Sequence, residues 1–150
     1  MTEQLDSAVR IEVVRSDPGV ALPVYAREGD AGLDVAAAAT VTLEPGGREL
    51  VPTGLRVAIP AGYAGLVMPR SGLALRSGVT VLNAPGLIDS GYRGEIGVLL
   101  VNHGARTVVI QRGERIAQLV IQPVARAQLV EVRELQESRR GEGGFGSTGA

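Results

Sequence analysis

Short aliphatic and β-branched runs, broken up by glycine and proline, are the feature that most constrains this fold. The 21 Gly and 8 Pro residues interrupt such runs over most of the chain. Turn signals recur at roughly 8–12 residues, a spacing typical of sandwiches and barrels. The runs that predict strands are Arg10–Arg15, Arg48–Ile59, Tyr63–Met68, Val79–Leu82, Gly94–Val101, Thr107–Ile110, Arg115–Pro123 and Gln128–Val132. We therefore expect an all-β fold, a distorted jelly-roll or β-clip double sheet.

Helical periodicity is nearly absent. One short helix is predicted over Ser71–Arg76, with Ser71 as its N-cap before the apolar residues that follow. The run Arg48–Ile59 is predicted to be interrupted at Pro52 and Gly54.

The composition changes near residue 137, which divides the chain into a predicted jelly-roll domain, 1–136, and a C-terminal arm, 137–150. The arm is rich in glycine and has no strand or helix pattern. Such a segment cannot bury enough apolar surface to offset its ordering entropy. It is either a frayed tail or a flexible arm whose Arg139, Arg140, Phe145, Ser147 and Thr148 order over an anionic ligand.

The composition leaves few residue types for catalysis. The chain of 150 residues has no Cys and one His, and every one of its 15 basic residues is Arg. A general base is therefore expected to be a carboxylate, and an anion is expected to be bound by arginine. The net charge of −1 predicts no nucleic-acid and no membrane partner. The N-terminus does not resemble a signal peptide, and the lack of cysteine fits a cytoplasmic protein.

The segment Gly86–Glu95 contains the clearest candidate site. Its Ser90-Gly91 pair predicts a tight β-hairpin that places Asp89 and Tyr92 opposite each other at its mouth. A carboxylate and an aromatic ring held this way form a small pocket with one base and one flat wall. The alternative is an ordinary hairpin in which Asp89 forms the turn and Tyr92 is half-buried.

Three further segments could bind an anion, and each has a plain structural alternative. Arg70 precedes the predicted helix start, where exposed N–H groups and a guanidinium suit phosphate, but it could equally be a solvated arginine. Asp34 follows a glycine turn and could orient metal-bound water, or simply form the turn. Gln118 lies between two apolar strand residues and could reach a phosphate or face solvent.

Two other segments carry no predicted site. The glycine-rich stretch Arg140–Gly149 resembles a phosphate loop only loosely, because it lacks the lysine and the strand–helix context of a P-loop. His103 lies in a predicted turn and is assigned no role.

Taken in order, five segments resemble the five motifs of the trimeric deoxyuridine triphosphatase (dUTPase) family. They are Ala31–Val35, Pro69–Leu73, Gly86–Glu95, Arg112–Leu119 and Arg140–Gly149. The one departure is Val35, where leucine is more usual. The resemblance implies a jelly-roll homotrimer that hydrolyses dUTP to dUMP and pyrophosphate, with active sites shared between chains.

The resemblance also implies roles for the residues around the predicted hairpin. Asp89 would be the general base that activates the attacking water at the α-phosphorus. Tyr92 would pack against the deoxyribose, where a ribose 2′-OH would otherwise lie. The uracil edge would be read by the neighbouring residues Asn83, Leu87, Ile88, Asp89 and Gly97.

The remaining motifs imply a phosphate site and a lid. Arg70, Ser71 and Gly72 would hold the triphosphate, and Gln118 would lie near the α-phosphate. Asp34 would contact Mg²⁺, the implied cofactor, only through water. In the arm, Phe145 would stack on uracil, while Arg140, Gly146, Ser147 and Thr148 would hold the γ-phosphate end.

Two rival functions fit the same fold. A dCTP deaminase, or a bifunctional deaminase–dUTPase, would need a catalytic glutamate and a different hairpin. A non-enzymatic trimeric binding module would be expected to have lost some of the functional residues, yet the chain keeps Asp89, Tyr92, Arg70, Gln118 and Phe145.

Overall fold

The computed structural model describes residues 8–149 and shows an almost purely antiparallel β architecture with one helix. The elements are β1 (Glu12–Arg15), β2 (Val24–Tyr25), β3 (Leu33–Ala36), β4 (Val41–Leu43), β5 (Arg48–Ala58), β6 (Tyr63–Pro69), α1 (Ser71–Ser77), β7 (Val79–Val81), β8 (Gly86–Ile88), β9 (Glu95–Asn102), β10 (Val108–Ile110) and β11 (Arg115–Pro123). No helix within residues 8–149 is both long and apolar enough to cross a membrane.

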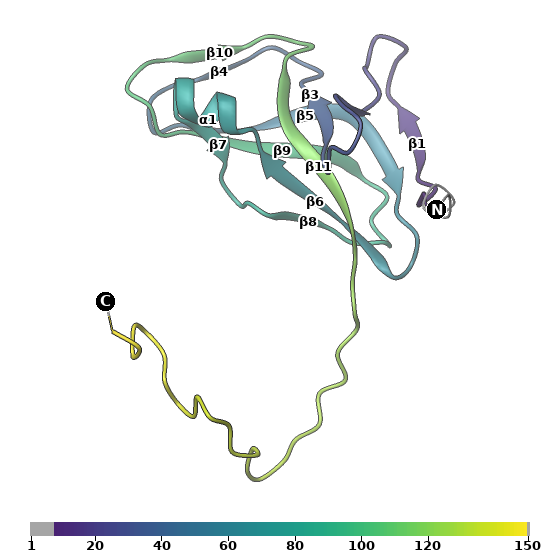
Figure 1. Cartoon of the computed structure of the whole chain (residues 1–150). Helices are drawn as coiled ribbons and strands as arrows, with labels where there is room; N and C mark the ends of the chain where they lie inside the picture. The colour runs from purple at the N-terminus through teal and green to yellow at the C-terminus, as the bar shows by residue number, and fades with distance from the viewer. Residues whose placement is uncertain (1–7, 150) are drawn as a thin grey trace.

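The strands form two main sheets and one small one (Figure 1). The four-stranded sheet has the order β1-β5-β9-β7, and the five-stranded sheet has the order β2-β3-β11-β6-β8. Strands β4 and β10 pair with each other as a separate two-stranded sheet. This arrangement confirms the predicted all-β jelly-roll fold with one short helix.

The core is aliphatic, as the scarcity of aromatic residues requires. It contains fully buried side chains from both main sheets, including Val51, Val98, Leu100, Ile116 and Leu119. Burying a side chain of this size contributes about 1.5–3 kcal/mol. Tyr92 and Phe145, by contrast, are exposed, so they are free for roles other than packing.

Strand β5 runs through the predicted interruption. Its pairing with β9 shifts register between Pro52 and Arg56, and Gly54 adopts a positive φ of 68°. The glycine absorbs the irregularity, because a positive φ is strained for other residues. The strand therefore bends at this point without ending.

Helix α1 confirms the predicted helix, but its predicted cap is wrong. The N-cap residue is Arg70, which has an extended backbone and makes no side-chain cap hydrogen bond, and Ser71 is the first helical residue. A helix capped by Ser71 would begin at Gly72, so the observed helix begins one residue earlier than the serine signal predicts. The helix ends at Gly78, which has a positive φ of 69° and donates its N–H to Ala74 O at 2.9 Å.

The predicted β-hairpin at Ser90-Gly91 is also wrong. The turn itself is present, since the Tyr92 N–H donates to Asp89 O at 3.1 Å. However, β8 pairs with β6 in one sheet, whereas β9 pairs with β5 and β7 in the other. The turn is therefore a corner that carries the chain from one sheet to the other.

The chain beyond β11 leaves the body of the molecule. Val124 still donates its N–H to Gly62 O at 2.9 Å, but residues 125–149 contain no helix or strand. The strand predicted over Gln128–Val132 is therefore absent from this single chain. Figure 1 shows the segment extending away from the sheets. Leu129, Val130 and Leu135 are largely exposed along it.

Candidate active site

A pocket of about 180 Å³ lies at the corner between the two sheets. Its walls come from β6, from β8 and β9, and from the turns on either side of β8. The lining residues are Val67, Val81, Asn83, Gly86, Leu87, Ile88, Asp89, Tyr92, Glu95, Ile96, Gly97 and Leu99. The structure thus brings together six residues that the sequence predicts for base and sugar recognition: Asn83, Leu87, Ile88, Asp89, Tyr92 and Gly97.

Strand β8 points its side chains alternately into the core and out to the pocket face. Ile88 is buried, whereas Leu87 and Asp89 are exposed on either side of it. Within residues 8–149, no side chain or backbone group hydrogen-bonds to the Asp89 carboxylate. A carboxylate with no such partner is placed to accept a proton from a bound water.

Tyr92 is fixed beside that carboxylate by its hydroxyl. The Tyr92 hydroxyl donates to Glu95 O at 2.8 Å. The ring lies so close over Gly94 that a β-carbon there would collide with it. The glycine thus allows the ring to fold back and form one wall of the pocket.

Arg93 stabilises the corner from outside. Its Nη1 donates to Ser90 O at 2.7 Å and to Tyr92 O at 2.9 Å. Sequence reasoning missed this role because an arginine beside a turn carries no signal of which carbonyls it will reach.

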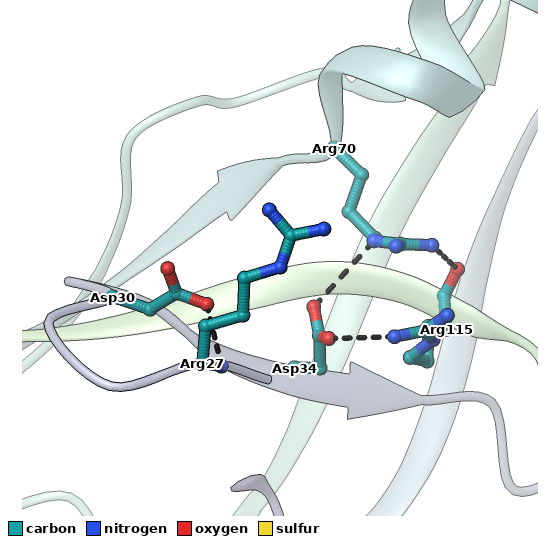
Figure 2. A network of polar contacts seen from close by, with 5 residues as sticks. All are labelled: Arg27, Asp30, Asp34, Arg70 and Arg115. Carbon is teal, nitrogen blue, oxygen red and sulfur yellow. Dashed lines mark hydrogen bonds and ion pairs between the residues drawn. The ribbon is translucent and has the colours of Figure 1, made fainter. Parts of the chain in front are cut away.

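A second polar cluster gathers around Asp34 on β3 (Figure 2). Asp34 is buried, and its Oδ2 accepts a hydrogen bond from Arg115 Nη1 at 3.0 Å. Arg70 Nε lies 3.5 Å from Asp34 Oδ1, and Arg70 Nη1 donates to Arg115 O at 3.1 Å. A buried carboxylate needs such partners, because desolvating an unpaired charge is costly. Around Asp34, the two arginines outnumber the one carboxylate, a charge balance that suits an anion.

Gln118 lies on β11 beside this second cluster. It is directly opposite Asp34 in the β3–β11 pairing and opposite Met68 in the β6–β11 pairing. A β-carbon on Gly32 would lie 3.0 Å from Gln118 Cβ, so this glycine leaves room for the glutamine side chain. Ser71 and Gly72 follow Arg70 at the start of α1.

The residues of this cluster fit Mg²⁺ only in an indirect way. Within residues 8–149, no group of three or more His, Cys, Asp or Glu residues could hold a metal ion directly. However, Asp34 Oδ1 is buried and makes no hydrogen bond. It is available to accept one from a metal-bound water, which suits an ion held mainly by substrate phosphates.

The pocket and the arginine cluster lie near opposite ends of β6. Ile88 pairs with Gly65, so Asp89 follows on beside Ala64, while Arg70 directly follows the other end of the strand. The six-residue span from Ala64 to Arg70 corresponds to roughly 20 Å of strand. Within one chain, Asp89 and Arg70 are therefore too far apart to act on adjoining atoms of one small substrate.

The arm residues are not brought to either cluster. Phe145 is fully exposed, and Arg140 Nε donates to Gly143 O in its own loop at 2.8 Å. Gly146, Ser147 and Thr148 are likewise exposed in the arm. In this single chain the arm extends away from the sheets (Figure 1).

These features together define a class of protein. A jelly roll with a small pocket walled by an aromatic ring, a free carboxylate in that pocket and a separate arginine-rich anion site suits a ligand with a flat ring and a phosphate chain. Such a ligand is a nucleotide.

Comparison with known proteins identifies the family. A family model described as dUTPase matches residues 19–149, and the chain therefore belongs to the dUTPase family. A deoxyuridine 5'-triphosphate nucleotidohydrolase of Anaeromyxobacter sp. (strain Fw109-5) is 61% identical over 132 residues, covering 88% of this chain and 90% of the relative. One from Thermobifida fusca (strain YX) is 58% identical, covering 94% and 79% respectively. The chain is accordingly a hydrolase that acts on dUTP.

Solved structures support the same assignment. A mutant dUTPase of Staphylococcus bacteriophage 80alpha with dUpNHpp has a TM-score of 0.88 and 31% identity, covering 94% of this chain and 99% of that one. A mutant dUTPase of phage phi11 of S. aureus, whose structure describes the coordination of a structural Mg(II) ion, has a TM-score of 0.77 and 28% identity, covering 83% and 97%.

Proposed function

We propose that this enzyme cleaves dUTP to dUMP and pyrophosphate by direct attack of water at the α-phosphorus. Asp89 takes a proton from the water as its oxygen bonds to the α-phosphorus. The bond from that phosphorus to the α,β-bridging oxygen breaks, and pyrophosphate leaves. The observation that carries the proposal is the unpaired Asp89 carboxylate beside the fixed ring of Tyr92.

The pocket supports selection of deoxyuridine. Tyr92 would pack against the deoxyribose, leaving no room for a ribose 2′-OH and so disfavouring UTP. The backbone around Leu87 and Ile88, with Asn83 and Gly97, would pair with the uracil edge. A site built for these hydrogen bonds leaves groups unpaired with cytosine, which penalises dCTP. The narrow corner would also exclude the methyl group of thymine.

The arginine cluster supports binding of the phosphates. Arg70, Ser71 and Gly72 would hold the triphosphate, with Gln118 near the α-phosphate and Asp34 hydrogen-bonded to a water of the metal ion. When bound, Mg²⁺ would neutralise part of the phosphate charge. Positioning and charge neutralisation supply most of the catalysis in reactions of this kind.

The separation of the two clusters supports a shared site in a homotrimer. Roughly 20 Å of β6 between Asp89 and Arg70 is too far for one chain to serve both functions at one substrate. We infer that Asp89 and Tyr92 of one chain act with Arg70 and Gln118 of another. Leu50 and Leu87, which are 65% and 63% exposed, are apolar surface that assembly would cover.

The arm is proposed to act as a lid on the site of another chain. Phe145 would stack on uracil, and Arg140, Gly146, Ser147 and Thr148 would bind the γ-phosphate end. The extended course of residues 125–149 supports this role, because an arm that leaves its own body is free to reach a neighbour.

In the cell, the reaction would keep uracil out of DNA and supply dUMP for dTMP synthesis. A cytoplasmic location remains a prediction from the sequence.

Pyrophosphate release from dUTP, UTP, dCTP and dTTP, each with Mg²⁺, tests this proposal. We expect rapid hydrolysis of dUTP alone. Asp89→Asn should still bind dUTP but hydrolyse it at least about 100-fold more slowly, the lower end of typical general-base effects. Undiminished hydrolysis would remove Asp89 as the base, and ammonia release from dCTP would favour the deaminase.

A further inference from the structure

We propose that Arg115 is a positioning residue that holds the triphosphate-binding Arg70 in place, acting through Asp34. This inference rests on the proposed function, because it assumes that Arg70 binds the phosphates of dUTP. Neither Arg115 nor the contact that it makes with Asp34 is needed for the proposals above. Both follow from the local geometry of β11 (Figure 2).

A bulge in β11 is what brings Arg115 to this cluster. Arg115 and Gln118 are three positions apart, so in a regular strand their side chains would point to opposite faces. The register shifts between them: Arg115 is opposite Ala36, whereas Ala117 is opposite Val35. The extra residue, Ile116, puts both Arg115 and Gln118 on the face that carries Asp34.

Burial supports this interpretation of the bulge. Ile116 and Ala117 are consecutive in sequence, yet both are almost completely buried. Two adjacent strand residues both point into the core only where the alternation is broken. Arg115 is then diagonal to Asp34 across the strand pair, a distance that a long side chain can span.

Arg70 is held at two points, and both depend on residue 115. Its Nη1 donates directly to Arg115 O at 3.1 Å, and its Nε faces Asp34 Oδ1 at 3.5 Å. Asp34 is in turn fixed by the shorter contact with Arg115 Nη1, at 3.0 Å. Within residues 8–149, no protein group bonds to Arg70 Nη2, which leaves that end of the guanidinium for a phosphate.

The arrangement has two consequences for binding. Fixing Arg70 before the substrate arrives reduces the conformational entropy that binding would otherwise lose. In addition, Arg115 compensates the buried Asp34 charge, so the charge of Arg70 remains available to the substrate. Without Arg115, Asp34 would draw Arg70 toward itself and compete with the phosphate.

Calorimetric binding of dUpNHpp and of dUMP to the assembled enzyme tests the inference. The variants are Arg115→Gln, Arg70→Gln and the double variant. We expect Arg115→Gln to raise the dissociation constant for dUpNHpp about ten-fold. The dissociation constant for dUMP, which lacks the β- and γ-phosphates, should change by less than about two-fold. Because Arg115 acts through Arg70, the double variant should bind dUpNHpp no more weakly than Arg70→Gln alone.

Arg27→Gln is the matched control for charge. Figure 2 shows Arg27 in the same cluster, and only its backbone N–H bonds to a partner there, Asp30 Oδ2 at 2.9 Å. Arg27→Gln removes the same formal charge without removing a contact to Asp34. It should therefore reduce the affinity for dUpNHpp clearly less than Arg115→Gln does. Arg115→Lys keeps a charged donor for Asp34 and should restore much of the affinity.

Each of the following results would overturn the inference. Additive effects of Arg70→Gln and Arg115→Gln would mean that Arg115 acts independently of Arg70. Equal losses in Arg27→Gln and Arg115→Gln would reduce the effect to general electrostatics. An equal loss of affinity for dUMP and dUpNHpp in Arg115→Gln would indicate a purely structural role. Unfolding of both Arg115→Gln and Arg115→Lys would indicate the same. If the wild type failed to bind dUpNHpp, the proposed function itself would fail, and the inference with it.

Discussion

At the scale of single residues, a local hydrogen bond fixes the orientation of the Tyr92 ring. Its hydroxyl donates a hydrogen bond to Glu95 O, so the ring rather than the hydroxyl faces the pocket. Gly94 beneath the ring leaves the space that this conformation requires. The proposed role of Tyr92 in selecting the sugar would therefore depend on the ring, whereas the hydroxyl fixes the orientation of the ring.

Two substitutions at Tyr92 separate these contributions. Tyr92→Phe keeps the ring and loses one hydrogen bond, so it should lower the free energy of unfolding by about 0.5–1.5 kcal/mol and largely retain the preference for dUTP over UTP. Tyr92→Ala removes the wall, and the ratio of kcat/KM for dUTP over UTP should fall at least about ten-fold. Steady-state kinetics with both nucleotides checks this, and an unchanged ratio in Tyr92→Ala would exclude the ring as the selector.

Asn102 is a residue that matters to the fold rather than to the chemistry. It is fully buried, and its Nδ2 donates to Leu43 O at 2.9 Å and to Arg106 O at 2.8 Å, while its Oδ1 accepts from Gly104 N at 2.9 Å. Asn102→Ala would leave these three groups unsatisfied and should cost about 3 kcal/mol of stability. Chemical denaturation measures this loss, and a change below about 0.5 kcal/mol would contradict the account.

At the scale of elements, the sequence predicts strand positions better than strand partners. The bounds of β11 coincide with the predicted run Arg115–Pro123, since alternation and turn residues are local signals. The predicted hairpin fails because β8 and β9 join different sheets, a choice made by long-range pairing. The sequence also does not predict the very short strands β2 and β4. Strands of this length depend on a partner strand beside them, which local signals do not reveal.

The difference between local signals and long-range pairing also explains why the sequence mispredicts the arm and misses the bulge in β11. The segment 128–132 has a strand-like pattern but no strand in a single chain, where its apolar side chains remain exposed. A strand requires a partner edge, which another chain could supply. Arg115 could not be assigned from sequence either, because its orientation depends on a register shift with β3.

Removing the arm tests its role as an element. Deletion of residues 138–150 should leave the thermal unfolding midpoint and the trimer unchanged, because the described part of this segment packs against neither sheet. The dUTP hydrolysis rate should fall to a very low level, since water would no longer be excluded from the site. Wild-type turnover in the truncated enzyme would refute the lid.

At the scale of the whole molecule, we propose that no single chain contains a complete active site. The jelly roll places the base-recognition pocket and the phosphate cluster near opposite ends of one strand. Sequence motifs alone cannot show this, since they give order along the chain and not distance in space. If the two clusters serve one substrate, the proposed site is complete only where two chains meet.

Mixing two inactive variants tests that claim most directly. Asp89→Asn and Arg70→Gln each inactivate one half of every site, and the two variants would be unfolded and refolded together in equal amounts. If each site takes Asp89 and Arg70 from different chains, random trimers should recover about a quarter of wild-type dUTP hydrolysis, because half of the chains carry each intact half. Mixtures that remain as inactive as either variant alone would place both residues in one chain's site and contradict the account.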